Sequence, residues 1–387
     1  MAFILNEGQR EGVIKAIRWY YNDPIGSGKP AFFFTGSAGT GKSSSAKTAI
    51  EMMGLEPYQV IYATFTGKAA TVLRSKGCQA NTIHSLFYRI LQGDDGKVHF
   101  YKKRNFPNTI KLIVIDEVSM VDNKMMEDLM SFGIPLLCLG DPGQIPAMYY
   151  PNTYLANPDV FLTQVMRQKG ESGILKMATI VRNGGTLDYG QYNESRVIRF
   201  SELHDIERYD MVLCWSNKTR KEINTVIRKK LGLDKYKYPQ PGEKLLCLRN
   251  NYNYNIVCDD DIVINPVNGM FMVNNSETIV HEGYLDMNYT PDFLNPRIQR
   301  FKTPVSLEPF DNPDFDKVDK GAIMNIDPNQ VVLTYGYAST VHKSQGSQWP
   351  NVLFIDDYRG PKDQYKNLAY TAITRASESV TYVKGII

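Results

Sequence analysis

The residues most able to do chemistry lie in "GSAGTGKS", residues 36–43, where a glycine, four further residues and Gly-Lys-Ser follow one another. We expect a buried strand before this stretch, over residues 31–35, and a helix after it, from Lys42 to Met53. Backbone N–H groups in such a turn surround an anion at the helix N-terminus. The predicted nucleotide-binding residues of this loop are Gly36, Ala38, Gly39, Thr40, Gly41, Lys42, Ser43 and Ser44.

An acidic pair completes the predicted phosphate chemistry. We expect Lys42 to reach the β- and γ-phosphates of ATP, and the hydroxyl of Ser43 to ligate Mg²⁺. "VIDEVSM" supplies Asp116 and Glu117 at the end of another apolar run. Asp116 is placed to hold Mg²⁺, and Glu117 to orient and deprotonate the attacking water. The cofactors predicted from these residues are therefore ATP and Mg²⁺.

A second, incomplete version of the loop lies just upstream in "PIGSGKP". Its Gly28-Lys29 pair has Asp23 where the first glycine should stand and Pro30 where the Ser or Thr should stand. The phosphate cradle needs both of these positions. We therefore predict a surface loop here.

Three more polar side chains fit a site for transferring phosphoryl groups. Gln144 follows a strand in "GDPGQIPA", where its amide could sense the γ-phosphate. The alternative is an ordinary type I or II turn built on Pro142 and Gly143. Arg167 in "LTQVMRQ" and Arg375 in "LAYTAITRASESV" supply cations for the charge that develops in the transition state.

Length and composition set the class of protein. A chain of 387 residues is long enough for two or more domains. A net charge of +3 confines any nucleic-acid site to a local groove. The five cysteines are odd in number and form no C-x-x-C pair, so we expect reduced thiols. The chain opens with no basic-then-apolar leader and has no apolar stretch of ~18 residues, so we expect a cytoplasmic protein and no membrane partner.

Apolar runs alternate with helical patterns and predict an α/β fold with parallel sheets. Residues 59–64, 110–116 and 134–140 are such runs in a first unit, residues 1–155. Runs at 211–216, 331–338, 351–356 and 380–385 belong to a second, residues 156–237 and 330–387. Residues 238–329 are rich in Pro, Asn and aromatics with short alternating runs, which predicts an inserted β-barrel without a convincing helix.

The order of the motifs resembles one family. It runs "LNEGQREGV", "GSAGTGKS", "YATFTGKAA", "NTIHSLF", "VIDEVSM", "GDPGQIPA", "LTQVMRQ", "YASTVHKSQGSQW" and "YTAITRA". This series resembles the superfamily 1 helicases of the 5′-to-3′ branch, the RecD-like and Dda-like enzymes. The resemblance spans nearly the whole chain and implies two RecA-like P-loop domains, a small subdomain at residues 86–108, and an SH3-like barrel in the second domain.

The resemblance also implies roles for single residues. Gln9 resembles the glutamine that reads adenine, and Gln345 and Gly346 resemble residues that couple the nucleotide cleft to the DNA strand. The residues in motifs that contact single-stranded DNA in the family are Thr64, Phe65, Thr66, Thr82, His84, Thr340 and His342. Hydroxyls can grip phosphates and aromatics can stack on bases. The family often has proline in place of Phe65, so this residue is either a base contact or part of the core.

Turn residues between alternating runs predict a β-hairpin over residues 91–106. In the family, a small subdomain at this place is the wedge that splits the duplex; the alternative is an ordinary surface hairpin. Phe100 and Tyr101 are the aromatics we place at the fork, with Lys102 and Lys103 against the phosphates.

The leading hypothesis is an ATP-driven motor that moves 5′ to 3′ on single-stranded DNA and unwinds forked duplex DNA. The predicted partners are these DNAs, with activity as a monomer and a possible single-strand binding or replisome protein. Two alternatives stay open: a nucleic-acid-dependent ATPase that remodels or displaces bound proteins, and an RNA helicase on the same fold. A preference for the 2′-OH cannot be recognised from these residues.

Overall fold

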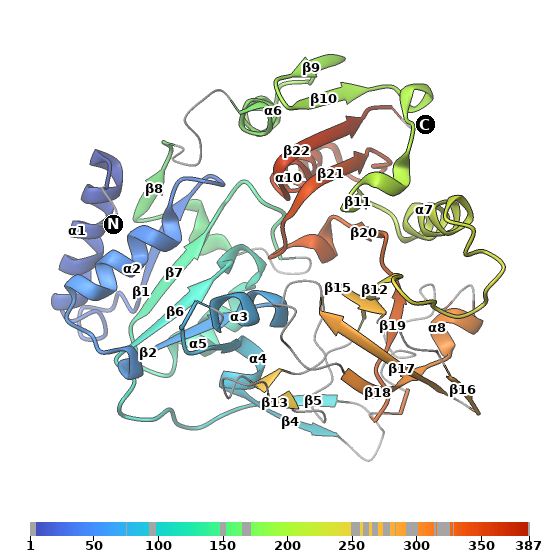
Figure 1. Ribbon diagram of the computed structural model, residues 1–387. Coiled ribbons are helices and arrows are strands. Elements are labelled where there is room, and N and C mark those ends of the chain that lie inside the picture. Colours follow the sequence, from blue (N-terminus) through green and yellow to red (C-terminus); the bar gives the residue numbers. More distant parts are fainter. Residues whose placement is uncertain are drawn as a thin grey trace.

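The structure is a computed structural model. It describes residues 5–74, 76–92, 98–147, 152–164, 172–248, 256–257, 263–264, 270–273, 279–282, 284–291, 301–312, 315, 326–327 and 329–385. Three sheets account for most of it: two parallel-type sheets with helices packed on them, and one antiparallel sheet (Figure 1). No helix among these residues is both long and apolar enough to span a membrane.

A six-stranded parallel sheet forms the centre of the first α/β unit, in the order β3-β2-β6-β7-β1-β8. Its strands are β1 (Ala31–Gly36), β2 (Val60–Thr64), β3 (Ala80–Thr82), β6 (Leu112–Asp116), β7 (Leu136–Gly140) and β8 (Val160–Leu162). The helices of this unit are α1 (Glu7–Tyr21), α2 (Lys42–Met52), α3 (Gly67–Arg74), α4 (Ile83–Phe87) and α5 (Asn123–Met130).

Alternating residues of β1 explain why helices cover both faces of this sheet. Phe32 and Phe34 pack in the core with α1 and α2, while Phe33 packs in a second core with α4 and α5. Successive side chains of a strand point to opposite faces, so a continuous apolar run fits a sheet that is buried on both sides.

The first unit is longer than predicted. We placed its end at residue 155, but β8 lies beyond this point and pairs in parallel with β1 as the edge strand of the first sheet. The strand is only three residues long, and its apolar pattern alone cannot show which sheet it joins.

The second α/β unit is built on the sheet β20-β11-β21-β22-β10-β9. Its strands are β9 (Gly190–Tyr192), β10 (Ser195–Ile198), β11 (Met211–Cys214), β20 (Ala338–Thr340), β21 (Trp349–Ile355) and β22 (Ala376–Val383). All neighbours are parallel except β9 and β10. The helices are α6 (Gly173–Arg182), α7 (Asn217–Lys230) and α10 (Lys362–Ile373).

The antiparallel sheet has the order β16-β17-β15-β12-β19, with β18 also paired to β17. Its strands are β12 (Lys244–Cys247), β15 (Met270–Val273), β16 (Ile279–His281), β17 (Tyr284–Pro291), β18 (Phe301–Ser306) and β19 (Leu333–Tyr335), and β13 (Ile256–Val257) pairs separately with β14 (Val263–Ile264). Two predictions were wrong here. A short helix, α8 (Glu308–Asp311), lies in the insert, and the run 331–338 is divided between two sheets.

A buried ion pair joins the antiparallel sheet to the second α/β unit. Arg228 on α7 donates from Nε to Glu243 Oε1 at 2.8 Å, directly before β12. The hydroxyl of Tyr337, between β19 and β20, also donates to Glu243, and the guanidinium of Arg228 lies 4.0 Å from the centre of the Tyr335 ring. The sheet is therefore anchored to this unit at a point where charge, hydrogen bonds and aromatic packing coincide.

Two strands outside the main sheets, β4 (Tyr88–Gln92) and β5 (Val98–Lys102), pair antiparallel, with Tyr88 opposite Lys102. They lie at the bottom of the view in Figure 1. The first strand begins at Tyr88, three residues before the predicted start, and the predicted turn residues Gly93–Gly96 lie outside the described residues.

The remaining short elements are the 3₁₀ turns η1 (Pro57–Gln59), η2 (Val118–Met120), η3 (Thr153–Ala156), η4 (Phe200–Glu202), η5 (Ile206–Arg208) and η6 (His342–Ser344). The expected reduced thiols are found at Cys138, Cys214 and Cys247, which are buried, and at Cys78, which is partly buried. Cys258 lies outside the described residues.

Candidate functional site

The glycine-rich loop leaves β1 and enters α2 in a conformation that requires its glycines. A Cβ added to Gly36 would lie 2.7 Å from Thr40 Oγ1 and 2.8 Å from the Leu162 side chain. Gly39 and Gly41 have φ values of 77° and 80°, in the left-handed region that favours glycine. The loop thus forms a backbone cradle at the N-terminus of α2, where an anion is favoured.

Lys42 lies at the centre of the predicted charges. Its Nζ donates to the backbone oxygens of Gly36 at 2.8 Å and Ser37 at 2.9 Å. Burial lowers the pKa of Lys42. The charged groups that also act on this pKa are Asp141, Glu117 and Asp116, which raise it, and Arg375, which lowers it. Four predicted or neighbouring groups from both α/β units therefore lie within electrostatic reach of one lysine.

The two acidic residues repel each other, and the backbone of Glu117 is in an uncommon conformation. Burial, followed by repulsion from Glu117, raises the pKa of Asp116 to about 6, although Asp116 Oδ1 accepts a 3.0 Å hydrogen bond from the Glu117 N–H. Glu117 has φ 55°, a left-handed conformation that is uncommon outside glycine and concentrated at functional sites. A cation beside Asp116 would offset the repulsion, and the oxygens of Asp116 and Ser43 are the donor type that Mg²⁺ prefers.

Gln144 lies in the loop of residues 141–145 that follows β7, which we call the Gln144 loop. The residue is only 5% exposed. Its Oε1 is buried and has no hydrogen-bond partner among the described residues. Buried acceptors are normally paired, so this atom fits a site completed by a bound group or an attacking water. The second α/β unit contacts the same loop, because Gln345 Nε2 donates to the Ile145 oxygen at 2.9 Å.

Gln9 is attached to the glycine-rich loop from α1. Its Nε2 donates to the Thr40 oxygen at 2.9 Å, and its Oε1 accepts from the Asn6 N–H at 3.0 Å in a capping box. The side chain is fully buried, with both polar atoms bonded within the chain. The structure thus connects Gln9 to the loop, and its contact with adenine stays a prediction.

The arginines differ in how far the structure describes them. Arg375 is buried and donates to the oxygens of Thr371 and Ser347, each at 3.2 Å. Arg167 lies outside the described residues. Arg182, at the end of α6, was missed: it hydrogen-bonds Ser37 Oγ of the glycine-rich loop. No motif marks Arg182, so only the three-dimensional arrangement could identify it.

Arg182 also lines a cavity of about 380 Å³ between the two α/β units. Its guanidinium lies 4.7 Å from the centre of the Phe161 ring. The other lining residues are Ser37, Ala38, Thr163, Leu175, Ala178, Thr179, Asn183, Tyr370 and Thr374. The cavity therefore adjoins the glycine-rich loop on the side that faces the second unit.

The residues predicted to contact DNA lie where strands of both sheets end. Thr64 ends β2, and its Oγ1 donates to the Thr66 oxygen at 2.8 Å. Thr82 ends the adjacent β3 and caps α4, and Thr340 ends β20, the edge strand of the second sheet. The strand ends of the two units lie close together at Gly346 of the second unit. A Cβ added to this glycine would lie 3.0 Å from Thr66 Oγ1 of the first unit.

Four rings form what we call the aromatic cluster: Phe65, His84, Tyr88 and Phe100. The His84 ring centre lies 5.7 Å from that of Phe65 and 5.1 Å from that of Phe100. Phe65 is partly buried, whereas Phe100 is 49% exposed and the adjacent Tyr101 is 54% exposed. The cluster therefore links the β4–β5 pair directly to the motifs that end β2 and β3.

Burial acts on the two histidines that are predicted to contact DNA, and the two lysines near this cluster bond within the first unit. Burial lowers the pKa of both His84 and His342. Lys102 Nζ contacts Ser131 Oγ at 3.0 Å and Asp128 Oδ1 at 3.4 Å, and Lys103 Nζ donates to the Ser85 oxygen at 2.8 Å. Their ammonium groups are therefore bound within the first unit, and the contact of both lysines with DNA phosphates stays a prediction.

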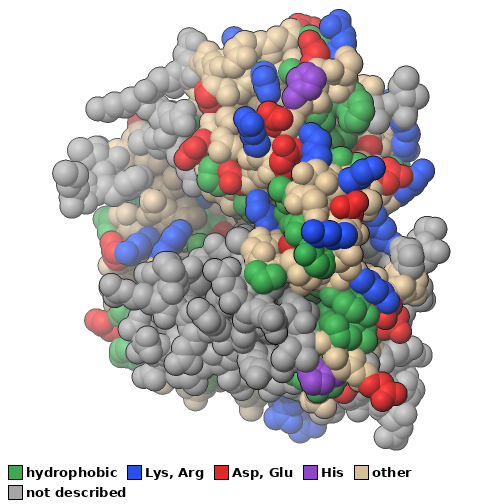
Figure 2. Space-filling view, turned by 45° about the vertical axis from the view of Figure 1, so that its right-hand side comes forward, with side chains coloured by type: hydrophobic (Ala, Val, Ile, Leu, Met, Phe, Trp, Pro, Cys, Tyr) green, Lys and Arg blue, Asp and Glu red, His purple; other side chains and the backbone are tan. Residues whose placement is uncertain are grey.

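The surface carries mixed charge. Figure 2 shows basic and acidic side chains interspersed over the coloured part of one face, with apolar side chains between them. This distribution agrees with a net charge of only +3. Attraction of a polyanion would accordingly depend on local contacts, because a weak net charge gives only a weak long-range field.

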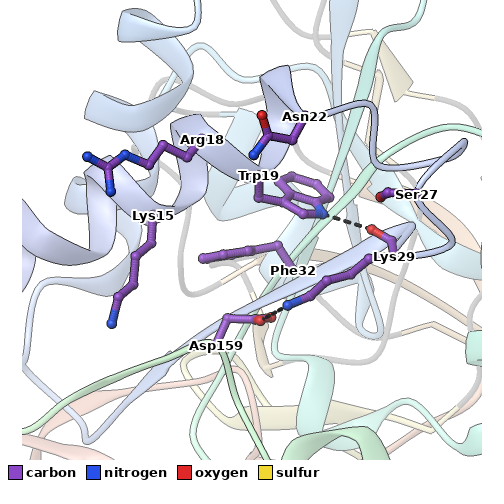
Figure 3. Close-up of a pocket in the computed structure, with 8 residues that line it drawn as sticks. All are labelled: Lys15, Arg18, Trp19, Asn22, Ser27, Lys29, Phe32 and Asp159. Carbon is purple, nitrogen blue, oxygen red and sulfur yellow. Dashed lines mark hydrogen bonds and ion pairs between the residues drawn. The ribbon is translucent and has the colours of Figure 1, made fainter.

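The incomplete loop "PIGSGKP" is a turn with mostly exposed residues, as predicted. Lys29 is paired with Asp159, and its backbone oxygen accepts a 2.8 Å hydrogen bond from the Trp19 indole (Figure 3). These residues line a cavity of about 440 Å³ beside the beginning of β1, whereas the glycine-rich loop follows the end of the same strand. This lysine is thus committed to an ion pair that joins the turn to the segment before β8.

Known proteins are similar to both halves of the chain. A family model described as an AAA domain matches residues 5–202, and a model of a UvrD-like helicase C-terminal domain matches residues 335–383. The ATP-dependent RecD2 DNA helicase of Deinococcus radiodurans is 25% identical over 355 residues, covering 89% of this chain and 45% of the relative. The ATP-dependent DNA helicase dda of Enterobacteria phage T4 is 28% identical over 264 residues, covering 59% and 57%.

The chain thus spans about half the length of these relatives. Among solved structures, two Pif1 helicases coordinating at forked double-stranded DNA match with TM-score 0.56 and 17% identity, over 98% of this chain and 92% of that one. Bacteroides Pif1 bound to single-stranded DNA matches with TM-score 0.55 and 18% identity over the same shares. At this level of identity, the structural likeness establishes the fold.

Proposed function

We propose that this chain hydrolyses ATP to move 5′ to 3′ along single-stranded DNA and to unwind duplex DNA. The chain belongs to the superfamily 1 helicases of the RecD, Dda and Pif1 type, and its residues 5–202 form an AAA domain. One observation carries the proposal. Gln345 of the second unit donates to the Ile145 oxygen in the loop that holds Gln144. The adjacent Gly346 passes close to Thr66, one of the residues predicted to contact DNA, because a Cβ added to this glycine would lie 3.0 Å from Thr66 Oγ1. A change at the nucleotide cleft therefore has a direct path to the strand ends.

The chemistry follows from the groups around Lys42. The backbone oxygens of Gly36 and Ser37 now hold its ammonium group, which would turn to the β- and γ-phosphates of ATP when they fill the cradle. Glu117 accepts a proton from the attacking water, and Gln144 Oε1 accepts a hydrogen bond from it. Lys42 and Arg375, together with Arg167, stabilise the negative charge that develops on the transferred group.

Ser43 and Asp116 would hold Mg²⁺, which supplies charge neutralisation at the phosphates. The raised pKa of Asp116 supports this assignment, since a cation removes the repulsion that burial and Glu117 impose on its carboxylate. Gln9 would contact adenine from α1, beside the loop to which it is bonded.

Residues at the strand ends of both units grip the DNA strand in this proposal: Thr64, Phe65, Thr66, Thr82, His84, Thr340 and His342. Phe100 meets the fork as the wedge. Its contact with His84 supports this role, because a base that stacks on Phe100 would lie next to the gripping motifs. The insert at residues 238–329 would form the SH3-like barrel of the family.

A strand-displacement assay with ATP tests the proposal. We expect the wild-type chain to open a fork with a 5′ single-stranded tail and to leave the 3′-tailed counterpart closed. Opening of only the 3′-tailed fork would show that the polarity is wrong. DNA-stimulated hydrolysis with no strand separation would favour an ATPase that displaces bound proteins, and faster hydrolysis with RNA than with DNA would favour an RNA helicase.

A further inference from the structure

One face of α10 holds the Gln144 loop from the second unit. Asn367, Tyr370 and Thr371 are three and four positions apart and therefore share a face of the helix. The Asn367 amide lies 3.0 Å from the backbone oxygens of both Gly143 and Gln144, and the Ile145 N–H donates to Thr371 Oγ1 at 2.9 Å. The loop is hydrogen-bonded to this helix along most of its length.

Tyr370 adds a second connection from the same face. Its hydroxyl donates to Asp141 Oδ2 at 2.6 Å and accepts from the Ala38 N–H at 3.1 Å. Asp141 opens the Gln144 loop, whereas Ala38 belongs to the glycine-rich loop. A single hydroxyl of the second unit thus joins the two loops of the first unit that flank the phosphate site.

The surroundings of this hydroxyl leave little freedom. Tyr370 and Asp141 are both buried, and the other oxygen of Asp141 accepts the Gly143 N–H at 2.9 Å. A Cβ on Gly143 would lie 3.1 Å from the Tyr370 ring, so the loop passes tightly against it. Asp141 is also the leading carboxylate acting on the charge of Lys42. Displacement of Tyr370 would therefore be felt at both ends of the phosphate site.

We propose that Tyr370 is a positioning residue whose hydroxyl aligns the glycine-rich loop with the Gln144 loop for the chemical step of ATP hydrolysis. The proposal rests on the ATPase activity proposed above. The tyrosine ring alone fills the space in the core, but only the hydroxyl contacts both loops. Loss of the hydroxyl should accordingly slow the chemical step and leave nucleotide binding by the cradle in place.

The test compares Tyr370→Phe with Tyr365→Phe. Tyr365 lies on the same helix, and its hydroxyl donates to Asp356 within the second unit, so the control also loses one Tyr–Asp hydrogen bond but none across the cleft. The kcat and KM for ATP are measured with and without an oligo-dT strand, together with the melting temperature. For Tyr370→Phe we expect the DNA-stimulated kcat to fall about tenfold or more with KM changed less than about threefold, in the range of a lost transition-state contact. Tyr365→Phe should match the wild type.

Asn367→Ala is the second variant, because Asn367 is only partly buried and its loss should not prevent folding. It should lower kcat in the same way, again with KM changed less than about threefold. Equal kcat in the two tyrosine variants, or a full kcat in Asn367→Ala, overturns the positioning role while the proposed function stands. A wild-type chain that does not hydrolyse ATP overturns the proposed function and this proposal with it.

Discussion

The nucleotide cleft and the row of residues predicted to contact DNA both lie where strands end, but they are built differently. The cleft follows β1, β6 and β7, and the predicted DNA-contact row follows β2, β3 and β20. The cleft is buried and polar: Lys42, Asp116 and Gln144 lie where charges and hydrogen bonds from both units converge. The predicted DNA-contact row ends in the aromatic cluster, whose outermost ring, Phe100, is half exposed. In the proposed function, the chemistry would depend on groups preorganised away from water, whereas a grip on DNA would depend on surfaces that can bind any base.

The largest effect should come from the cleft, with Glu117→Gln. The amide keeps the shape of the side chain and removes the base, so hydrolysis should fall about 10²–10⁴-fold while ATP still binds. Single-turnover hydrolysis and binding of a fluorescent ATP analogue measure the two steps. A decrease of less than about tenfold would show that Glu117 is not the base.

Lys42→Ala should lower ATP hydrolysis about 10²–10³-fold or more, because the cradle loses its cation. The matched control is Lys29→Ala, which removes the lysine of the incomplete loop. Lys29 is paired with Asp159 away from the cradle, so this variant should keep full turnover. The measurement is the steady-state ATPase rate of each variant. Equal rates in the two variants would contradict the assignment of the nucleotide site to the glycine-rich loop.

Salt should weaken DNA binding much more than ATP binding. A single strand held by ~5 phosphate contacts should bind about 100-fold more weakly in 200 mM than in 50 mM salt, because bound counterions are released. The KM for ATP should change by less than about threefold, since buried charges are screened less. ATPase titrations with oligo-dT at the two salt concentrations give both values. A DNA affinity that ignores salt would contradict phosphate gripping.

Phe100→Ala should lower unwinding without lowering ATP hydrolysis. The ring lies outside every nucleotide motif, so DNA-stimulated hydrolysis should stay within about twofold of the wild type, while unwinding of the 5′-tailed fork falls about tenfold as base stacking worth ~1–3 kcal/mol is lost. Phe200→Ala removes another exposed phenyl ring, in the second unit, and should affect neither activity. Normal unwinding by Phe100→Ala would leave the β4–β5 pair as an ordinary surface hairpin.

The smallest expected effect is the change in thermal stability at acidic pH. Burial lowers the pKa of His84 and His342 in the folded chain, so the unfolded chain takes up protons first as the pH falls. Their contribution to stability is fully present above the ordinary pKa of ~6.5 and is lost below it, toward the lower folded pKa values. The melting temperature should fall by a few degrees from pH 7.5 to pH 5.5. His84→Gln should flatten this dependence, and His204→Gln, at an exposed position, should not.

The sequence predicted the cleft better than its surroundings. The glycine-rich loop predicts Lys42 and Ser43, and the same loop upstream makes Asp116 and Glu117 the predicted acidic pair, because phosphate chemistry needs these residue types at strand ends. The structure brings Asp116 and Glu117 within electrostatic reach of Lys42. Tyr370 lies inside a motif we quoted, yet only its arginine was singled out. Its role depends on which residues α10 meets across the interface, and local pattern does not contain this information. Arg182 has no motif at all.

Fold prediction followed the same division. Continuous apolar runs correctly indicated buried parallel strands such as β1, β6 and β7. Apart from the unexpected short helix α8, the errors fell on three-residue strands, β8 and β19, which are too short to have a period of their own. Their sheet is selected by long-range pairing, with β1 and with β12, respectively.

The ion pair between Arg228 and Glu243 has a mechanical consequence. Removing one partner of a buried pair typically costs ~3–5 kcal/mol, because the other charge is left buried and unpaired, so both side chains should stay in place when the units move. The antiparallel sheet should therefore turn with the second unit as a stiff lever arm. A rotation of the second unit would accordingly carry the sheet with it, and β17, which lies two strands from β12, would move further than the junction itself.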